Sequence, residues 1–176
     1  MRRPAHRLLH LAMLAALSGT VHAAVYMTPE QAQAQMFPQQ KLQQDFRELT
    51  DDQVAAIRKA SGKSPLSSQL KAWRAEDGGW FIVDEVVGKH EFITYAVSLD
   101  ASGAVKEVEI LDYREAYGQQ VQEAAWLRQF VGKRAGQSLK LGTDVRNISG
   151  ATLSSQHVTD GVRRLLATYA VVLARN

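Results

Sequence analysis

The stretch "NISGATLSSQHV", residues 147–158, gathers small hydroxylated side chains directly before an amphipathic pattern. The N-terminus of a helix presents unpaired backbone N–H groups and the positive end of the helix dipole, and both favour an anion such as phosphate. Gly150 and Ala151 let the backbone approach a ligand closely, and a nearby hydroxyl can hydrogen-bond to phosphate or form an ester with it. These hydroxyls belong to Ser149, Thr152, Ser154 and Ser155. The alternative is ordinary helix capping, because Ser and Thr commonly precede helices.

Histidine and lysine supply three further candidates. His90 lies in "GKHE", a turn before an expected strand, and either contacts the ligand or is solvated. His157 is expected on the surface of the last helix, and two His without a carboxylate pair at ligand spacing do not indicate a metal site. Lys133, after "QFVG", either pairs with phosphate or caps the preceding helix, whose C-terminus favours a cation.

Several kinds of chemistry are excluded by composition. The chain has no cysteine, which rules out disulfides, thiolate metal sites, iron–sulfur clusters and covalent c-type haem attachment. Neither a Ser-His-Asp order nor a P-loop or Rossmann glycine loop is found, so a hydrolase is not indicated. Any redox chemistry would therefore need an organic cofactor held by oxygen and nitrogen groups.

The residues after this stretch predict a long helix that positions it. Apolar residues at i, i+4, i+7, i+8, i+11, i+14 and i+15 form one stripe, which must pack on another element. The stripe consists of Val158, Val162, Leu165, Leu166, Tyr169, Val172 and Leu173.

The middle of the chain alternates in hydrophobicity and predicts antiparallel strands. These are residues 70–75, 80–87, 92–99 and 105–113, joined in part by the turns 77–79 and 100–103. Residues 119–131 return to helical spacing, with Val121, Ala124, Leu127 and Val131 expected on one side and Gly132 at the end. Tryptophans at 73, 80 and 126 are assigned to the core rather than to a cofactor.

Two capped helices are expected before the strands. Thr28-Pro29-Glu30-Gln31 and Thr50-Asp51-Asp52-Gln53 each place a Thr before the helix and a Gln at its third position, which is a capping-box pattern. The first helix should stop near Phe37 and the second at Gly62. The interpretation is one α/β (α+β) domain over residues 24–176, with a helical extension at about 28–62 and a largely antiparallel core at about 69–176.

The first 23 residues predict a secretory signal peptide. Arg2, Arg3 and Arg7 precede an apolar run of about ten residues, and Val21-His22-Ala23 resembles a cleavage site, so we expect export to the periplasm. This segment carries three of the 21 basic residues and no acidic ones, which leaves 18 basic against 18 acidic. The mature chain is thus neutral, and nucleic acid is not an expected partner.

"SGATLSS" before an amphipathic helix in an exported chain resembles the FMN-binding domain family, which occurs in flavin-carrying subunits of the sodium-pumping NADH:quinone oxidoreductase and its ferredoxin-linked relatives. The similarity extends from about Gly88 to Leu173, through "GKHEFITYAVSLDASGAVKEVEIL" and "YREAYGQQVQEAAWLRQFVGK". It implies FMN as cofactor, joined through its phosphate to the last Thr of the S/T-G-A-T motif by a flavin transferase. That residue is Thr152, followed by Leu153.

An E-T-P-G-L-G element lies near the flavin in that family. Here Glu115 and Gly118 agree with it, whereas Ala116 and Tyr117 replace Thr and Pro, and Tyr117 could offer an aromatic face to the ring. Arg146 stands where the family commonly has an Asp, while Asp144 is two residues further from the motif. A cation at position 146 is favourable near a phosphate.

The resemblance implies a periplasmic electron carrier that passes electrons between redox partners, one of them membrane-bound or periplasmic, rather than an enzyme with its own substrate. Two other classes remain open. One is a module that binds FMN reversibly, and the other is a cofactor-free accessory of a membrane redox complex.

Overall fold

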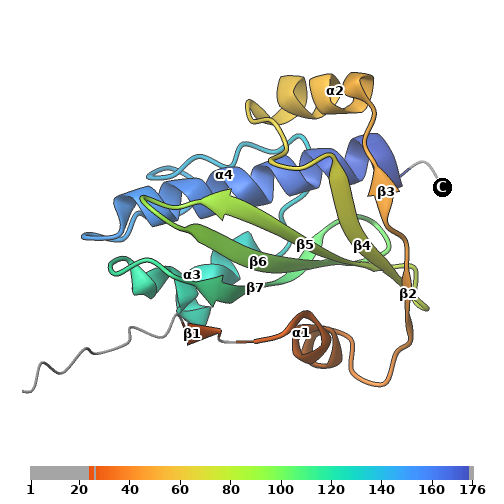
Figure 1. The fold of residues 1–176 in the computed structure, drawn as a ribbon, viewed down its shortest axis with the longest axis horizontal. Helices are drawn as coiled ribbons and strands as arrows, with labels where there is room; N and C mark the ends of the chain where they lie inside the picture. The colour runs from red at the N-terminus through yellow and green to blue at the C-terminus, as the bar shows by residue number, and fades with distance from the viewer. Residues whose placement is uncertain (1–23, 26, 175–176) are drawn as a thin grey trace, which may run out of the picture.

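A computed structural model describes residues 24–25 and 27–174, so the predicted signal peptide lies outside the described part. Its centre is an antiparallel sheet with the strand order β1-β7-β6-β5-β4-β2, in which β4 also pairs with β3 (Figure 1). The strands are β1 (Ala24–Val25), β2 (Leu42–Gln44), β3 (Arg47–Glu48), β4 (Gln69–Ala75), β5 (Trp80–Val87), β6 (Phe92–Leu99) and β7 (Val105–Tyr113). The four strands expected from sequence are therefore present, and β1, β2 and β3 were not predicted. Their backbones pair with β7 or β4, which sequence alternation over two or three residues cannot reveal.

The last helix covers one face of this sheet (Figure 1). α4 (Thr152–Thr168) continues as a π-helical turn, Tyr169–Leu173. The predicted stripe is confirmed, because all its members except the half-buried Tyr169 are buried. Gly161 explains how α4 comes so close to the sheet: a Cβ there would lie 2.6 Å from Val86 Cγ1 and 2.7 Å from Tyr95 Oη.

An ion pair inside this interface fixes α4 to β5. Arg164 is 5% exposed, and its Nη2 lies 2.7 Å from Asp84 Oδ2 and 2.6 Å from the carbonyl oxygen of Glu85. Tyr95 donates its hydroxyl to the same Asp84 oxygen at 2.9 Å, and burial beside Asp84 holds the pKa of Tyr95 well above its ordinary value. A buried charge of this kind is tolerated because each of its hydrogen-bonding groups has a partner.

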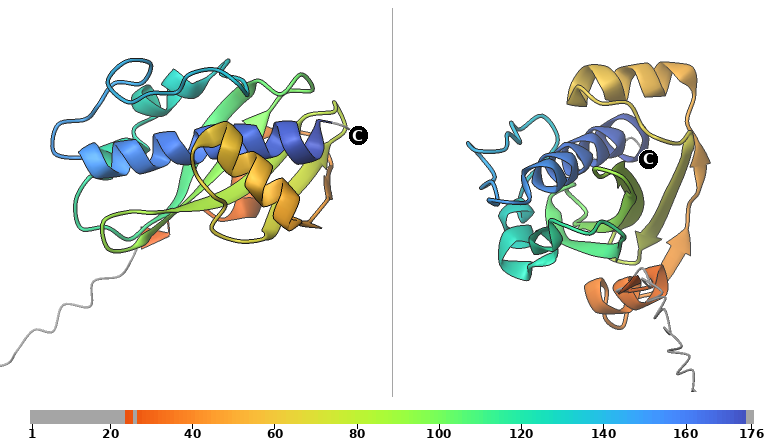
Figure 2. Two further views of the ribbon diagram at one scale, coloured as in Figure 1. Left: turned by 90° about the horizontal axis from the view of Figure 1, so that it is seen from above. Right: turned by 60° about the vertical axis from the view of Figure 1, so that its left-hand side comes forward.

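Two shorter helices lie on either side of the sheet and α4. α2 (Asp51–Ser61) packs on the outer side of α4, whereas α1 (Pro29–Met36) lies on the opposite face of the sheet (Figure 2). Both helices begin with the predicted capping boxes, in which Thr28 pairs with Gln31 and Thr50 pairs with Gln53. Each Thr side chain accepts one of the backbone N–H groups that the first turn leaves unpaired.

The prediction of a single helix over residues 119–131 is wrong. The chain forms three short turns there: η1 (Gln119–Gln122), α3 (Ala124–Leu127) and η2 (Arg128–Phe130). Glu123 adopts an extended backbone between the first two and interrupts the helix. The face also differs, because Trp126 and Phe130 are buried with Val121 and Leu127, whereas Val131 is 49% exposed. Contacts with the sheet edge, which the sequence does not display, outweigh helix propensity over so short a segment.

Among the described residues, none of the helices combines the length and the apolar character needed to cross a membrane.

Candidate functional site

The N-terminus of α4 differs from those of α1 and α2. Its N-cap residue is Ala151, and no side chain caps the helix. Four hydroxylated residues are nevertheless present between positions 149 and 155, namely Ser149, Thr152, Ser154 and Ser155. The first backbone bond of the helix runs from the N–H of Ser155 to the carbonyl of Ala151. In the described part of the chain, the N–H groups of Thr152, Leu153 and Ser154 have no acceptor. This end of α4 is therefore open to an anion rather than capped.

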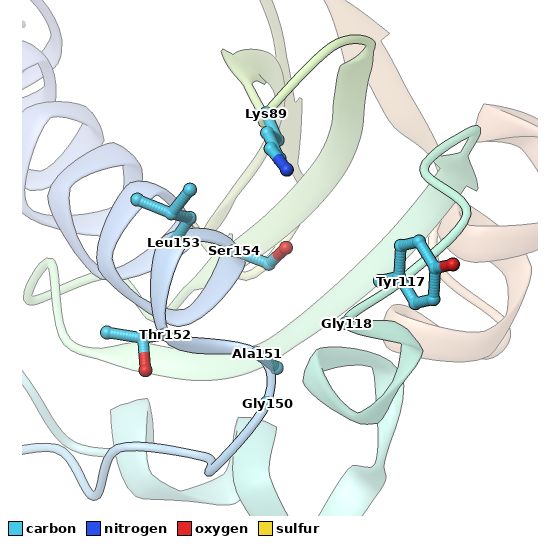
Figure 3. A pocket seen from close by; sticks show the side chains of 8 residues that line it. All are labelled: Lys89, Tyr117, Gly118, Gly150, Ala151, Thr152, Leu153 and Ser154. Carbon is cyan, nitrogen blue, oxygen red and sulfur yellow. The ribbon is translucent and has the colours of Figure 1, made fainter.

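A pocket of ≈ 370 Å³ lies at this helix end (Figure 3), within the size range of small-molecule and cofactor sites. Three segments form it: the turn between β5 and β6, the loop after β7, and the start of α4. The lining residues are Lys89, Tyr117, Gly118, Gly150, Ala151, Thr152, Leu153 and Ser154. Of the predicted site residues, the structure thus brings together the two glycines, Tyr117 and four consecutive residues from Ala151 to Ser154.

Two glycines shape the walls of this pocket. Gly150 has φ 81°, a left-handed conformation, and a Cβ there would have no atom within 4 Å, so space above this backbone is open to a ligand. Gly118 has φ 89°, and a Cβ there would lie 2.7 Å from both Ser154 Oγ and Tyr113 Oη. Gly150 therefore leaves the pocket open, whereas Gly118 lets the loop after β7 pack on α4.

The four predicted hydroxyls occupy very different surroundings. Thr152 is exposed and lines the pocket, and its Oγ1 accepts a hydrogen bond from Asn147 Nδ2 at 3.1 Å, which leaves its own proton free. Ser155 is fully buried, and Ser149 is exposed but lies outside the lining.

Ser154 lines the pocket but is 6% exposed and engaged with Tyr113. Tyr113 donates its hydroxyl proton to the carbonyl of Tyr117 at 2.5 Å, so the 3.0 Å contact between Ser154 Oγ and Tyr113 Oη is donated by the serine. The environment therefore singles out Thr152 as the accessible nucleophile of the pocket.

Glu115 has a structural position that the sequence did not reveal. It is buried, and its Oε1 accepts the backbone N–H groups of His90 at 2.6 Å and Glu91 at 3.1 Å. Burial raises the pKa of Glu115, but the N–H groups of His90, Glu91 and Lys89 outweigh it, so that pKa lies below its ordinary value. The carboxylate thus holds the β5–β6 turn in place instead of lining the pocket.

Lys89 precedes the two residues whose N–H groups Glu115 binds, and it lines the pocket. From the sequence, its neighbour His90 was expected there instead. The ammonium of Lys89 points into the pocket in Figure 3, whereas the exposed His90 is not among the lining residues. The lysine in "GKHE" was the sequence feature that pointed to this position, because a cation and a helix N-terminus both attract anions.

Aromatic and apolar side chains stand at the mouth of the pocket. Tyr117 is 82% exposed and Leu153 is 50% exposed. They offer an unpaired aromatic face and an aliphatic surface to a flat ligand.

Two predicted residues lie elsewhere. Arg146 is exposed beside Gln129, whose Oε1 accepts its backbone N–H at 2.9 Å, and its own carbonyl accepts the Trp126 indole N–H at 2.8 Å. Lys133 follows η2 and joins β7 through its carbonyl, which accepts the Val105 N–H at 2.9 Å. Neither lines the pocket, and Trp126 was not foreseen as the residue that holds the loop before the motif.

His157 lies one turn further along α4, at a second pocket of ≈ 220 Å³ that also contains Asp160 and Arg164. Both charges are already paired there, Asp160 with Lys63 and Arg163 and Arg164 with Asp84. Within the described residues, no group of three or more His, Asp or Glu side chains could hold a metal ion.

Residues 88–167, from the end of β5 to the last turn of α4, match the model of the FMN-binding domain family. This segment contains every residue that lines the pocket. No curated protein matches the chain.

Proposed function

We propose that the chain, whose residues 88–167 match the FMN-binding domain family, is a periplasmic electron carrier that holds FMN through a phosphoester to Thr152. FMN supplies the redox chemistry, since it accepts and gives up one or two electrons. The residues described above bind and orient it.

The observation that carries this proposal is the uncapped start of α4. Three free N–H groups and the positive end of a 17-residue helix converge where the pocket opens. Phosphate is the ligand group that such a helix end stabilises best. Gly150 leaves room above the backbone for that phosphate, so the residues present fit the cofactor of the family.

Thr152 is the proposed attachment point because it unites three properties. Its hydroxyl is exposed, it lines the pocket, and it stands at the first position of α4, beside the free N–H groups. Attachment forms a bond between Oγ1 and the phosphorus of an activated flavin donor, such as a flavin diphosphate, while the P–O bond to the leaving group breaks and that group departs with its oxygen and the hydroxyl proton. The chain thereby gains the mass of one FMN less one water. We propose that a flavin transferase catalyses this step, as the resemblance of the motif implies.

The remaining lining residues would orient the ring. Tyr117 offers an exposed aromatic face and Leu153 an aliphatic one, and together they would cover part of a flat ligand. Ser154, tied to Tyr113, and Glu115, tied to the β5–β6 turn, keep the three pocket segments together.

Location and partners extend the same proposal. The basic and apolar order of the first 23 residues supports export, where a tethered cofactor cannot diffuse away. We propose a membrane-bound or periplasmic redox partner, because an electron carrier needs a donor and an acceptor for its electrons.

Co-expression of the chain with a periplasmic flavin transferase tests the proposal. We expect a mass gain of one FMN less one water, mapped to Thr152 and retained after denaturation. Thr152→Ala should abolish the gain, whereas the control Ser149→Ala, in the same loop but outside the pocket lining, should retain it.

An unmodified wild-type chain that releases FMN on denaturation would overturn the ester and support the reversible binder instead. A colourless chain that binds no FMN in either form would support the cofactor-free accessory.

A further inference from the structure

Lys89 is the one charged residue among the eight that line the pocket. It comes from the β5–β6 turn, and its ammonium is directed into the space between Tyr117 and the first turn of α4 (Figure 3). In the part of the chain that the structure describes, its side chain forms no ion pair or hydrogen bond. A lysine without a partner that faces a pocket is available to a negatively charged ligand group.

The turn that carries Lys89 is held rigidly. Glu115 accepts the N–H groups of the next two residues, and Gly88 donates its N–H to the Glu91 carbonyl at 2.7 Å. A Cβ at Gly88 would lie only 2.9 Å from that carbonyl oxygen and closer still to Glu115 Oε1, so the turn is also closely packed. The backbone therefore fixes where the lysine side chain begins.

The pocket thus has two separate positive features. The start of α4, with three free N–H groups, serves the phosphate, and Lys89 projects from a different segment toward the interior of the same pocket. With the phosphate at Thr152, the rest of the cofactor would occupy the same pocket, and Lys89 would be the cation available to the flavin ring.

We propose that Lys89 sets the reduction potential of the flavin by stabilising the negative charge that the ring gains on reduction. This inference rests on the proposed function. Uptake of two electrons and one proton leaves the ring with one net negative charge, and a nearby ammonium lowers the energy of that state more than the energy of the neutral oxidised ring. Removal of the ammonium should therefore lower the potential.

Three neighbouring groups limit the size of this effect. Glu91 and His90 are exposed in the same turn, and the Glu115 carboxylate, though paired with backbone N–H groups, is ionised. Solvent also screens an exposed ammonium. We therefore expect the contact between Lys89 and the reduced ring to contribute an energy at the weak end of the usual range for charge-assisted hydrogen bonds.

The test is a redox titration of flavin-loaded full-length mature chains, with dithionite as reductant and reference dyes. Lys89→Met should weaken the binding of reduced flavin about tenfold relative to oxidised flavin, which corresponds to a two-electron potential lower by ~30 mV. Lys89→Arg keeps the charge and should remain near wild type. Lys71→Met removes an exposed lysine of β4 and should change nothing. The difference between Lys89→Met and wild type should shrink with added salt.

A second measurement separates the ring from the phosphate. In the Thr152→Ala background, equilibrium binding of FMN and of riboflavin, which lacks the phosphate, is compared with and without Lys89. If Lys89→Met weakens the binding of FMN but not that of riboflavin, and leaves the reduction potential unchanged, the inference is overturned and Lys89 is a phosphate ligand. These measurements need bound flavin but no ester, so loss of the ester alone leaves the inference testable. A wild-type chain that takes up no flavin would overturn both proposals.

Discussion

The hydroxyl groups at the start of α4 are chemically similar but differ in accessibility, because the fold surrounds each of them differently. Thr152 is accessible, Ser155 is enclosed, and Ser154 is occupied by Tyr113. Reactivity toward a bulky phosphate donor requires access, so side-chain chemistry by itself does not choose the acceptor. The same applies to Glu115, whose Oε1 accepts the backbone N–H groups of His90 and Glu91, so that it holds the turn carrying Lys89 instead of lining the pocket.

Ser154→Ala tests this distinction at the level of a single residue. The variant loses the hydrogen bond to Tyr113 and should be less stable by roughly 0.5–1.5 kcal/mol, as measured by urea unfolding of the flavin-free chain. It should still be modified at Thr152 by the transferase. Complete loss of modification in a folded Ser154→Ala chain would show that Ser154 contributes to attachment.

At the scale of elements, the β5–β6 turn depends on an ionised carboxylate. The pKa of Glu115 lies below its ordinary value of 4.5 in the folded chain. The stabilisation from Glu115 is therefore fully present above that ordinary value, and it is lost as the pH falls through the lower pKa of the folded state.

Thermal unfolding between neutral and acidic pH measures this contribution. Glu115→Gln should lower the melting temperature at neutral pH, and the gap to wild type should narrow as the pH falls through the folded-state pKa. Glu91→Gln, an exposed carboxylate in the same turn, is the matched control and should leave the curve close to that of wild type. If the difference in melting temperature between Glu115→Gln and wild type stays constant with pH, the charge of Glu115 contributes nothing to the stability of the fold.

Helix α4 holds the site against the sheet through its buried face. Leu166→Asp places an unpaired charge at a residue that is 1% exposed, and it should unfold the domain because that cost is comparable to a typical stability of roughly 5–15 kcal/mol. Val131→Asp is the control, because that valine is 49% exposed and a charge there meets water. Circular dichroism distinguishes the two, and a folded Leu166→Asp chain would contradict the assigned face.

The whole molecule is a layered arrangement in which α2, α4, the sheet and α1 follow one another (Figures 1 and 2). Its sheet begins with β1 at Ala24–Val25, which pairs with β7 at Tyr113 and Asp112. Cleavage after Ala23 would retain that strand, so processing and fold are compatible.

We expect the protein made in its native cell to begin near Ala24 and to be recovered from the periplasmic fraction. N-terminal sequencing of the purified chain checks both the site and the fact of processing. A cytoplasmic chain that keeps Met1 would remove the premise of export, although it would leave the flavin pocket unaffected.

The sequence by itself determined the features that arise from local spacing. The capping boxes of α1 and α2, the four long strands and the buried stripe of α4 all follow from patterns over a few neighbouring residues, and "SGAT" identified the helix end that the pocket surrounds. Such patterns can be read along the chain because hydrogen bonding and side-chain direction repeat with fixed periods in helices and strands.

Only the tertiary structure decided which residues meet at the site. Lys89, Tyr117 and Thr152 come from three separate segments, and their distances depend on how β6, β7 and α4 pack. The broken segment 119–131 and the edge strands β1 to β3 depend in the same way on partners far along the chain. A single sequence records the side chains but not their neighbours in space, and burial and nearby charge set the accessibility and charge of each group.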